Sequence, residues 1–188
     1  VSIIMRMAFT AAPSEAFYGE ESNWTYEAGL KALLLDQRLA LTVAAFLIDW
    51  KDMQISGASS VASFVGSVIS NAGGASSRGI ELEARFEPTR GSSIGFGYAY
   101  ADPEFDAGVV DRSASFQCAP DICNLGPTGP IVGGNRLPRT LEHQLTLDAG
   151  LSGRLTEQWR WAAHVDYAWN DDVYRDSINR LAYGARSL

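Results

Sequence analysis

The chain has 188 residues, a formal net charge of −7 and a sequence pI near 4.8, so a nucleic-acid-binding surface, which needs clustered positive charge, is not expected. Apolar residues make up 46% of the chain, yet no apolar run approaches the roughly 18 residues of a membrane-spanning helix. Eighteen Gly and many aromatic residues favour β-structure with frequent turns. Residue 1 is Val and no basic-then-apolar leader begins the chain, so we expect a piece of a longer or processed protein.

The first quarter of the chain contains three candidate strands. Val1–Phe9 is apolar and could be the end of a strand, and 10–21 reads as a loop. Ser22–Ala32 alternates between apolar and polar residues, which is the period of a β-strand. A short turn at 36–38 then leads into the candidate strand Leu39–Ile55.

The strand Leu39–Ile55 has apolar residues on both parities through Val43–Ile48. Because Asp49 and Lys51 share one parity, we expect the outward side chains to be the opposite set, Ala44, Phe46, Ile48 and Trp50. A β-bulge would change this assignment.

A clear β-hairpin follows the Ser/Gly/Ala-rich segment 56–77, which we expect to be a loop. Pro88–Gly91 has the composition of a tight turn, and alternation holds on both sides of it. One face is apolar: Ile80, Leu82, Ala84, Phe86, Ile94, Phe96, Tyr98 and Tyr100. The other carries Glu81, Glu83, Arg85 and Glu87 on the first strand, and Gly95, Gly97 and Ala99 on the second.

The rest of the chain holds two more alternating segments. The Gly-, Pro- and Asp-rich stretch 103–138 predicts a long irregular loop. Leu141–Leu151 and Gln158–Asn170 alternate, with a short turn at 152–157 between them, and 171–188 has no settled pattern. No helix of useful length is indicated.

Connection lengths indicate an up-and-down sheet. The connections near 35–38, 88–91 and 152–157 are tight, whereas those at 10–21, 56–77 and 102–139 are long. This places the short turns at one end of the sheet and the long loops at the other. Strands of about 10 residues, tilted by about 40°, rise roughly 25 Å, the height of an outer-membrane apolar band.

The tryptophans support the same interpretation. Trp24, Trp50 and Trp169 are expected near the long-loop end and Trp159 and Trp161 near the short-turn end, all on apolar faces. Two aromatic belts bracketing an apolar band are typical of a membrane barrel. A soluble β-sandwich also alternates, but its strands average about 5–6 residues and its connections need not alternate in length. We predict an all-β, antiparallel up-and-down transmembrane β-barrel, of which about seven strands are present, counting Val1–Phe9.

Five short motifs resemble the barrel of TonB-dependent outer-membrane receptors. In order they are Tyr26–Lys31, Asp49–Ile55, Asn71–Gly73, Ser77–Glu83 and Pro138–His143. The last resembles a strand entry that often reads Pro-x-x-Pro, with Leu141 in place of the second Pro. The resemblance covers roughly Glu20 to Asn170.

The resemblance implies part of an active transporter in the bacterial outer membrane, not an enzyme, with no cofactor. Such barrels have about 22 strands and a lumen closed by a plug domain of the same chain. The substrate is commonly a ferric siderophore or other iron complex, and the TonB complex supplies energy. We expect 1–188 to be a late barrel portion that lacks the plug and the segment that contacts TonB. Partners are outer-membrane lipid, the plug, TonB and a small-molecule substrate. Uptake of a carbohydrate or other nutrient, or a passive pore, is the alternative.

Face assignment gives a candidate lumen wall. The expected inward set is Glu27, Lys31, Glu81, Glu83, Arg85, Arg160, His164 and Asp166. It would pair with the plug and with passing solute, or would be a solvated wall with cross-strand ion pairs. Gly95 and Gly97 leave a track without side chains, which either admits the plug or bends the sheet.

The loop 103–138 holds both cysteines. Cys118 and Cys123 could close a small disulfide loop at the cell surface, hold a metal or remain free thiols. The acidic residues of this loop are either candidate ligand contacts or the ordinary composition of an exposed loop: Asp102, Glu104, Asp106, Asp111 and Asp121. An outer-membrane enzyme built on His164 and Asp166 is disfavoured, because residues two apart on a strand lie about 6.6 Å from each other and no nucleophile motif accompanies them.

Overall fold

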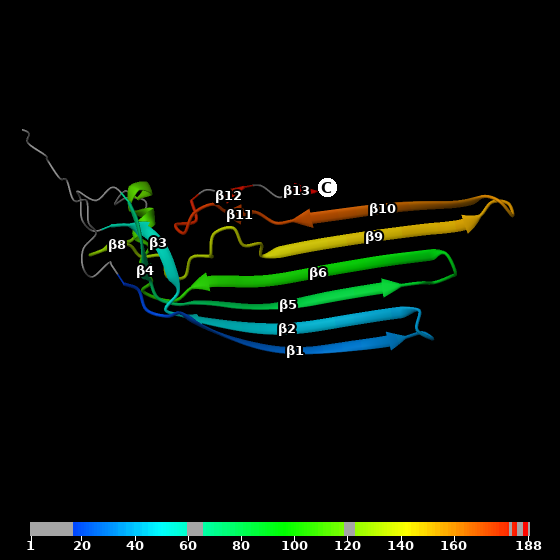
Figure 1. Cartoon of the computed structure of the whole chain (residues 1–188), viewed down its shortest axis with the longest axis horizontal. Coiled ribbons are helices and arrows are strands. Elements are labelled where there is room, and N and C mark those ends of the chain that lie inside the picture. Colours follow the sequence, from blue (N-terminus) through cyan, green and yellow to red (C-terminus); the bar gives the residue numbers. More distant parts are fainter. Residues whose placement is uncertain (1–16, 60–65, 119–122, 181, 184–185, 188) are drawn as a thin grey trace, which may run out of the picture.

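Figure 1 shows the computed structural model, which describes residues 17–59, 66–118, 123–180, 182–183 and 186–187. Its main feature is an open antiparallel sheet of long strands that run side by side. In spatial order the strands are β1 (Ser22–Leu34), β2 (Leu39–Lys51), β5 (Ala75–Phe86), β6 (Ser92–Phe105), β9 (His143–Arg154), β10 (Arg160–Asn170) and β13 (Arg186–Ser187). The predicted antiparallel, partial-barrel fold is confirmed. The expected strand Val1–Phe9 lies outside the described residues.

Short and long connections separate to opposite ends of the sheet, as predicted. We call the end with the short turns the turn end and the opposite end the loop end. The loop end carries three small hairpins and a 3₁₀ helix (Figure 1). They are β3 (Gln54–Ala58) with β4 (Ser67–Asn71), β7 (Leu125–Gly126) with β8 (Gly129–Pro130), β11 (Val173–Tyr174) with β12 (Ala182–Tyr183), and the helix Arg112–Gln117.

The six long strands contain between 11 and 14 residues. At about 3.3 Å per residue they extend roughly 36–46 Å, and a tilt of about 40° leaves a height of roughly 28–35 Å. β5 and β6 are longer than the predicted strands of about ten residues, because their pairing continues to Ala75 and Phe105 at the loop end. β2 and β10 are instead shorter than the predicted Leu39–Ile55 and Gln158–Asn170.

Two predicted boundaries near residue 52 are wrong. The strand expected to reach Ile55 ends at Lys51, because Asp52 adopts a left-handed backbone conformation (φ 53°). The side chain of Asn71 donates to the carbonyl oxygen of Asp52 at 2.6 Å and stabilises this break. The chain then forms the hairpin of β3 and β4, and β5 begins at Ala75, so strands occupy much of the segment 56–77 that we expected to be a loop.

The strand register gives the sheet two chemically distinct faces. Residues directly opposite each other on antiparallel strands lie on the same face. One row that crosses the sheet is entirely apolar: Leu30, Val43, Leu82, Tyr98, Leu145 and Trp169. A neighbouring row on the other face reads Lys31, Thr42, Glu83, Gly97, Thr146 and Ala168. We call the face of the first row the apolar face and that of the second the polar face.

The register overturns the predicted orientation of β2. Val43 and Leu47 belong to the apolar face, where they are 37% and 46% exposed, and the predicted outward residues Ala44, Phe46, Ile48 and Trp50 belong to the polar face. The charges of Asp49 and Lys51 misled the assignment. They pair with each other at 3.4 Å at the loop end of the strand, beyond the apolar band, where a charge on either face can reach water.

The buried apolar cluster in the described part of the chain lies at the loop end, not in the sheet. It consists of Met53, Ala75, Phe105, Val109 and Val132. Trp50 packs against this cluster from the polar face, so it does not belong to the aromatic belt in which we predicted it. The apolar face of the sheet, by contrast, remains exposed: Leu30, Ile80, Ile94, Leu151 and Val165 are between 48% and 68% exposed.

Candidate functional site

The polar face gathers the side chains that the sequence predicted for the lumen wall. Register pairing places them together on three strands: Glu27 and Lys31 on β1, Glu81, Glu83 and Arg85 on β5, and Arg160, His164 and Asp166 on β10. Between these strands lie the glycine-containing strand β6 and the polar side chains of β9. The arrangement is a mixed-charge surface rather than a field of one sign.

Arg85 is the centre of an ion-pair network that crosses three strands. Its guanidinium lies 3.6 Å from Oε1 of Glu87, just after the end of β5, and 3.8 Å from Oδ1 of Asp148 on β9. Asp148 is two strands away, and the residue between them in the register is Gly95. Asp148 lies on the polar parity of its strand but is not among the residues predicted for the lumen wall.

Gly95 is what allows that long reach. The carboxylate of Asp148 occupies the space that a side chain at Gly95 would fill. One row further on, Thr146 Oγ1 lies 2.5 Å from the position of a Cβ at Gly97. We predicted a track without side chains along β6. The prediction is wrong because neighbouring side chains from β9 lean across both glycines and cover the track.

His164 and Asp166 make direct contact, contrary to our expectation. Nε2 of His164 lies 2.8 Å from Oδ1 of Asp166. Backbone spacing along the strand keeps their Cα atoms apart, but both side chains are more than half exposed and bend towards each other. The pair is a solvated surface contact.

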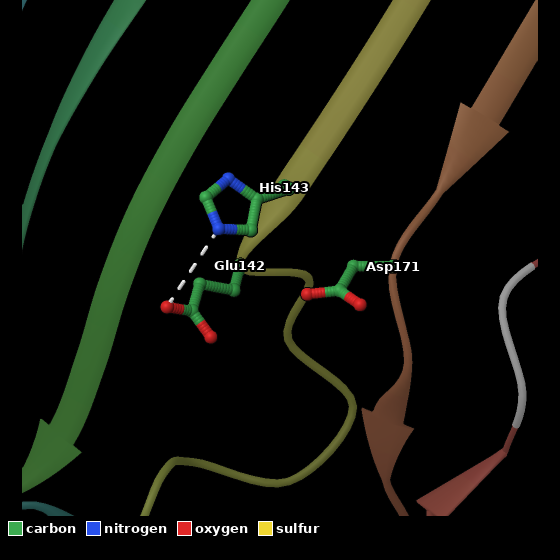
Figure 2. Close-up of side chains that lie close together, drawn as sticks. All are labelled: Glu142, His143 and Asp171. Atoms are coloured by element: carbon green, nitrogen blue, oxygen red, sulfur yellow. Dashed lines mark ion pairs between the residues drawn. The ribbon is translucent and has the colours of Figure 1, made fainter.

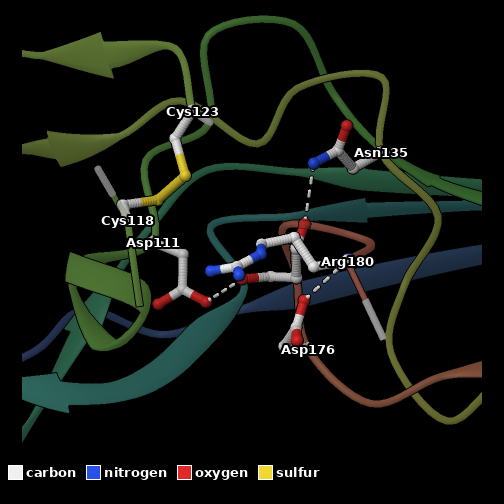
Figure 3. The surroundings of a disulfide bond; sticks show 7 residues. Asp111, Cys118, Cys123, Asn135, Asp176 and Arg180 are labelled. Carbon is white, nitrogen blue, oxygen red and sulfur yellow. Dashed lines mark hydrogen bonds between the residues drawn. A yellow bond between two sulfur atoms is a disulfide. The ribbon is translucent and has the colours of Figure 1, made fainter. Parts of the chain in front are cut away.

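At the loop end, Cys118 and Cys123 are joined by a disulfide (Figure 3). Of the three alternatives left open by the sequence, the structure therefore contains the first. The disulfide follows the 3₁₀ helix Arg112–Gln117, whose first turn is capped by Asp111.

Asp111 serves the packing of the loops. It is 6% exposed, and one carboxylate oxygen accepts hydrogen bonds from the backbone N–H and the hydroxyl of Ser113. The other oxygen accepts the hydroxyl of Ser177 at 2.5 Å, and the carbonyl of Ser177 accepts the side-chain amide of Asn135 (Figure 3). A carboxylate used in this way is not available to a ligand, so Asp111 is wrong as a predicted ligand contact.

The other acidic residues of the same loop differ in their surroundings. Asp102 pairs with Arg78 at 2.9 Å across the start of the sheet. Glu104 and Asp106 are exposed at the loop end. Asp121 lies outside the described residues. Glu104 and Asp106 are therefore the predicted contacts that the structure leaves open to solvent.

Two loops that are far apart in the sequence are fastened to each other. The side chain of Asn179 accepts the backbone N–H of Arg136 at 2.8 Å and donates to its carbonyl at 2.9 Å. Asn135 adds a second link by donating to the carbonyl oxygen of Ser177 at 2.8 Å, and within the first loop Thr140 donates to the carbonyl oxygen of Leu137. The loop after β6 and the segment after β10 thus form one packed unit above the sheet.

An antiparallel sheet with one exposed apolar face, one polar face and alternately short and long connections defines a section of an outer-membrane β-barrel. The family model described as TonB dependent receptor-like, beta-barrel matches residues 6–187. The chain belongs to this family of bacterial outer-membrane proteins, whose members are transporters rather than enzymes. In the described part of the chain, no helix is long and apolar enough to span a membrane.

Solved structures share the fold. The ferric yersiniabactin uptake receptor FyuA from Yersinia pestis is 21% identical, with a TM-score of 0.64 over 89% of this chain. BauA, the ferric preacinetobactin receptor from Acinetobacter baumannii, is 20% identical, with a TM-score of 0.62 over 88% of this chain. The alignments cover 21% of each receptor, so the chain spans about a fifth of the length of these relatives.

Proposed function

We propose that this chain is part of a TonB-dependent outer-membrane transporter that takes up a scarce solute, a ferric siderophore or another iron complex. The observation that carries the proposal is the family match over residues 6–187. The two solved relatives described above are both named as receptors for ferric siderophores, and this supports iron as the first substrate to test.

In this proposal the two faces of the sheet have separate tasks. The apolar face lies against lipid, with Trp24 and Trp169 near one membrane boundary and Trp159 and Trp161 near the other. The polar face lines the lumen and meets the plug domain of the same full-length chain. The Arg85 network, with its partners Glu87 and Asp148, is the part of the described wall best suited to pair with plug charges, because its ion pairs are long and partly exposed.

At the cell surface, the exposed carboxylates of Glu104 and Asp106 are the proposed ligand contacts on this part of the barrel. The packed loop unit holds them in place, since backbone bonds join Asp106 to Gly74 at 3.0 Å and Phe105 to Asn135 at 2.9 Å. A ligand would then meet a preformed surface.

The test is uptake of radiolabelled iron by cells that carry the full-length gene as their only iron-complex receptor. A panel of ferric catecholate, hydroxamate and phenolate complexes identifies the substrate class. We expect uptake of one class that is abolished by deleting tonB or by an uncoupler. Uptake that persists without the proton-motive force would instead identify a passive pore. Energy-dependent uptake of a carbohydrate with no iron uptake would move the substrate to the alternative class.

A further inference from the structure

Three metal-ligating side chains meet at the loop end, away from the polar face. Glu142, His143 and Asp171 each offer a ligand atom, and these atoms all lie within 4.8 Å of one another. Figure 2 shows the three side chains converging from two elements: Glu142 and His143 at the start of β9, and Asp171 just after β10. Each of the three is partly buried.

Main-chain hydrogen bonds fix the positions from which these side chains extend. The backbone N–H of Asp171 donates to the carbonyl oxygen of His143 at 3.0 Å, which continues the β9–β10 ladder by one residue. The carbonyl oxygen of Glu142 accepts the N–H of Ala101 at 2.9 Å. The cluster is therefore set by sheet pairing and does not depend on a loose loop.

Neighbouring groups orient the imidazole of His143 as they do in metal sites. The hydroxyl of Tyr98 lies 2.9 Å from Nδ1 of His143. The imidazole ring packs beside the rings of Tyr98 and Tyr100, at centroid distances of 6.1 and 5.1 Å. Nε2, on the other side of the ring, lies 3.9 Å from Oε1 of Glu142. A histidine that uses one ring nitrogen for an orienting hydrogen bond and directs the other at the site has the arrangement typical of a metal ligand.

The carboxylates are oriented in a similar way. The guanidinium of Arg136 binds Oε2 of Glu142, while Oε1 lies 3.9 Å from Nε2 of His143 (Figure 2). Asp171 Oδ1 accepts the backbone N–H of Asp172 at 2.7 Å. Arg136 balances one of the two carboxylate charges, and the second has no cationic side chain among the contacts described for it.

We propose that Glu142 Oε1, Nε2 of His143 and one carboxylate oxygen of Asp171 form a binding site for a divalent transition-metal ion such as Zn²⁺. One imidazole nitrogen and two carboxylate oxygens suit Zn²⁺ or Mn²⁺ better than Ca²⁺, which takes oxygen ligands alone. Bonds of about 2.0–2.2 Å require the three atoms to approach one another by roughly 1 Å. Three protein ligands leave a coordination position for water or an external ligand.

A bound ion would join the start of β9 to the end of β10 exactly where the packed loop unit begins. The ion would lie at the loop-end edge of the sheet, beside Tyr98 and Tyr100. The inference does not depend on the identity of the transported solute.

The test uses the full-length receptor purified in detergent, stripped with a chelator and titrated with Zn²⁺ alone. We expect H143A and D171N each to lose one Zn²⁺ per receptor relative to wild type. The matched control is H164A, which removes the other His–carboxylate pair of the chain and should leave the stoichiometry unchanged. Loss of the same Zn²⁺ in H164A, or its retention in H143A and D171N, would overturn the proposal.

A milder variant separates the loss of metal binding from misfolding. Y98F keeps the ring and removes only the hydroxyl that orients His143, so we expect an unchanged Tm for the metal-free receptor and a 10- to 100-fold weaker Zn²⁺ affinity, about the loss typical of such orienting groups. X-ray absorption of the one-Zn²⁺ complex should show nitrogen and oxygen neighbours at about 2.0–2.2 Å. Sulfur neighbours, or unchanged affinity in Y98F, would count against the site.

Discussion

The orientation of β2 is the assignment that separates the structure from the sequence pattern most sharply, and an arginine scan tests it. Val43 and Ala44 are adjacent, near the middle of the apolar band, and point to opposite faces. Val43 pairs with Leu30 and Leu82, whereas Ala44 pairs with Gly29 and Glu81. We expect V43R to be strongly destabilising and A44R to be tolerated, because the new guanidinium at 44 lies beside the carboxylate of Glu81.

The expected loss of stability in V43R follows from the cost of placing a charge in the bilayer. An arginine on the lipid face at mid-depth costs about 2–4 kcal/mol. That cost lowers the folding equilibrium constant roughly 30- to 700-fold. An arginine on the polar face meets water and should change the free energy of unfolding by no more than about 0.5 kcal/mol.

The assay is urea unfolding of the full-length receptor in lipid vesicles. The folded fraction is measured from the heat-modifiable mobility of the barrel on a gel. Spin labels on single cysteines give a second measurement, and the Cys118–Cys123 disulfide leaves no free thiol among the described residues to react. Labels at 43, Leu82 and Phe96 should contact lipid, and labels at 44 and Glu83 should not. If A44R were the destabilising variant, or label 44 the lipid-exposed one, the register of β2 would be refuted.

Three further predictions concern the polar face and the loop end. G95A should lower the free energy of unfolding by about 1–3 kcal/mol, because the new methyl group displaces the carboxylate of Asp148. In a D148A background the same substitution should cost less. Equal costs in the two backgrounds of this double-mutant cycle would contradict the contact between position 95 and Asp148. D111A should lower the free energy of unfolding by about 1–3 kcal/mol, because it leaves buried donors unpaired, and it should speed proteolysis of the loop 103–142. The control is E104Q, which changes an exposed carboxylate. Equal resistance to proteolysis in the two variants would argue against a packing role for Asp111. C118S should cost about 2 kcal/mol, the chain-entropy value for so short a loop; an unchanged Tm measured without reductant would show that the disulfide adds no stability.

The hairpin of β5 and β6 could be predicted from the sequence because its parity is unambiguous. From Ile80 to Phe86 only one face of β5 is free of charge, and the Arg78–Asp102 ion pair on the same face lies nearer the loop end, so Ile80 and Leu82 can face lipid and Glu81 and Glu83 cannot. The same physical rule failed on β2, where both parities are apolar. There the polar-face residues Phe46 and Trp50 are apolar for local reasons: Phe46 covers Gly79, and Trp50 packs on the loop-end cluster.

The contacts of the candidate site depend on pairings that no local pattern contains. Asp111 has the appearance of any acidic loop residue, and its partner Ser177 lies 66 positions further along the chain. A glycine at 95 indicates a missing side chain but does not say which neighbour takes the space. The cluster of Glu142, His143 and Asp171 is likewise assembled by the β9–β10 pairing, although the three residue types were visible separately in the sequence.

The two glycines of β6 have a consequence for how the wall of this barrel can change. Along β6 the chemistry presented on the polar face belongs to Asp148 and Thr146, which are encoded on the next strand of the sheet. A substitution at 148 or 146 therefore alters two adjoining columns of the wall at once, whereas positions 95 and 97 can hardly vary while those side chains remain. A redesign of the polar face of this section should therefore mutate β9 and keep the glycines of β6.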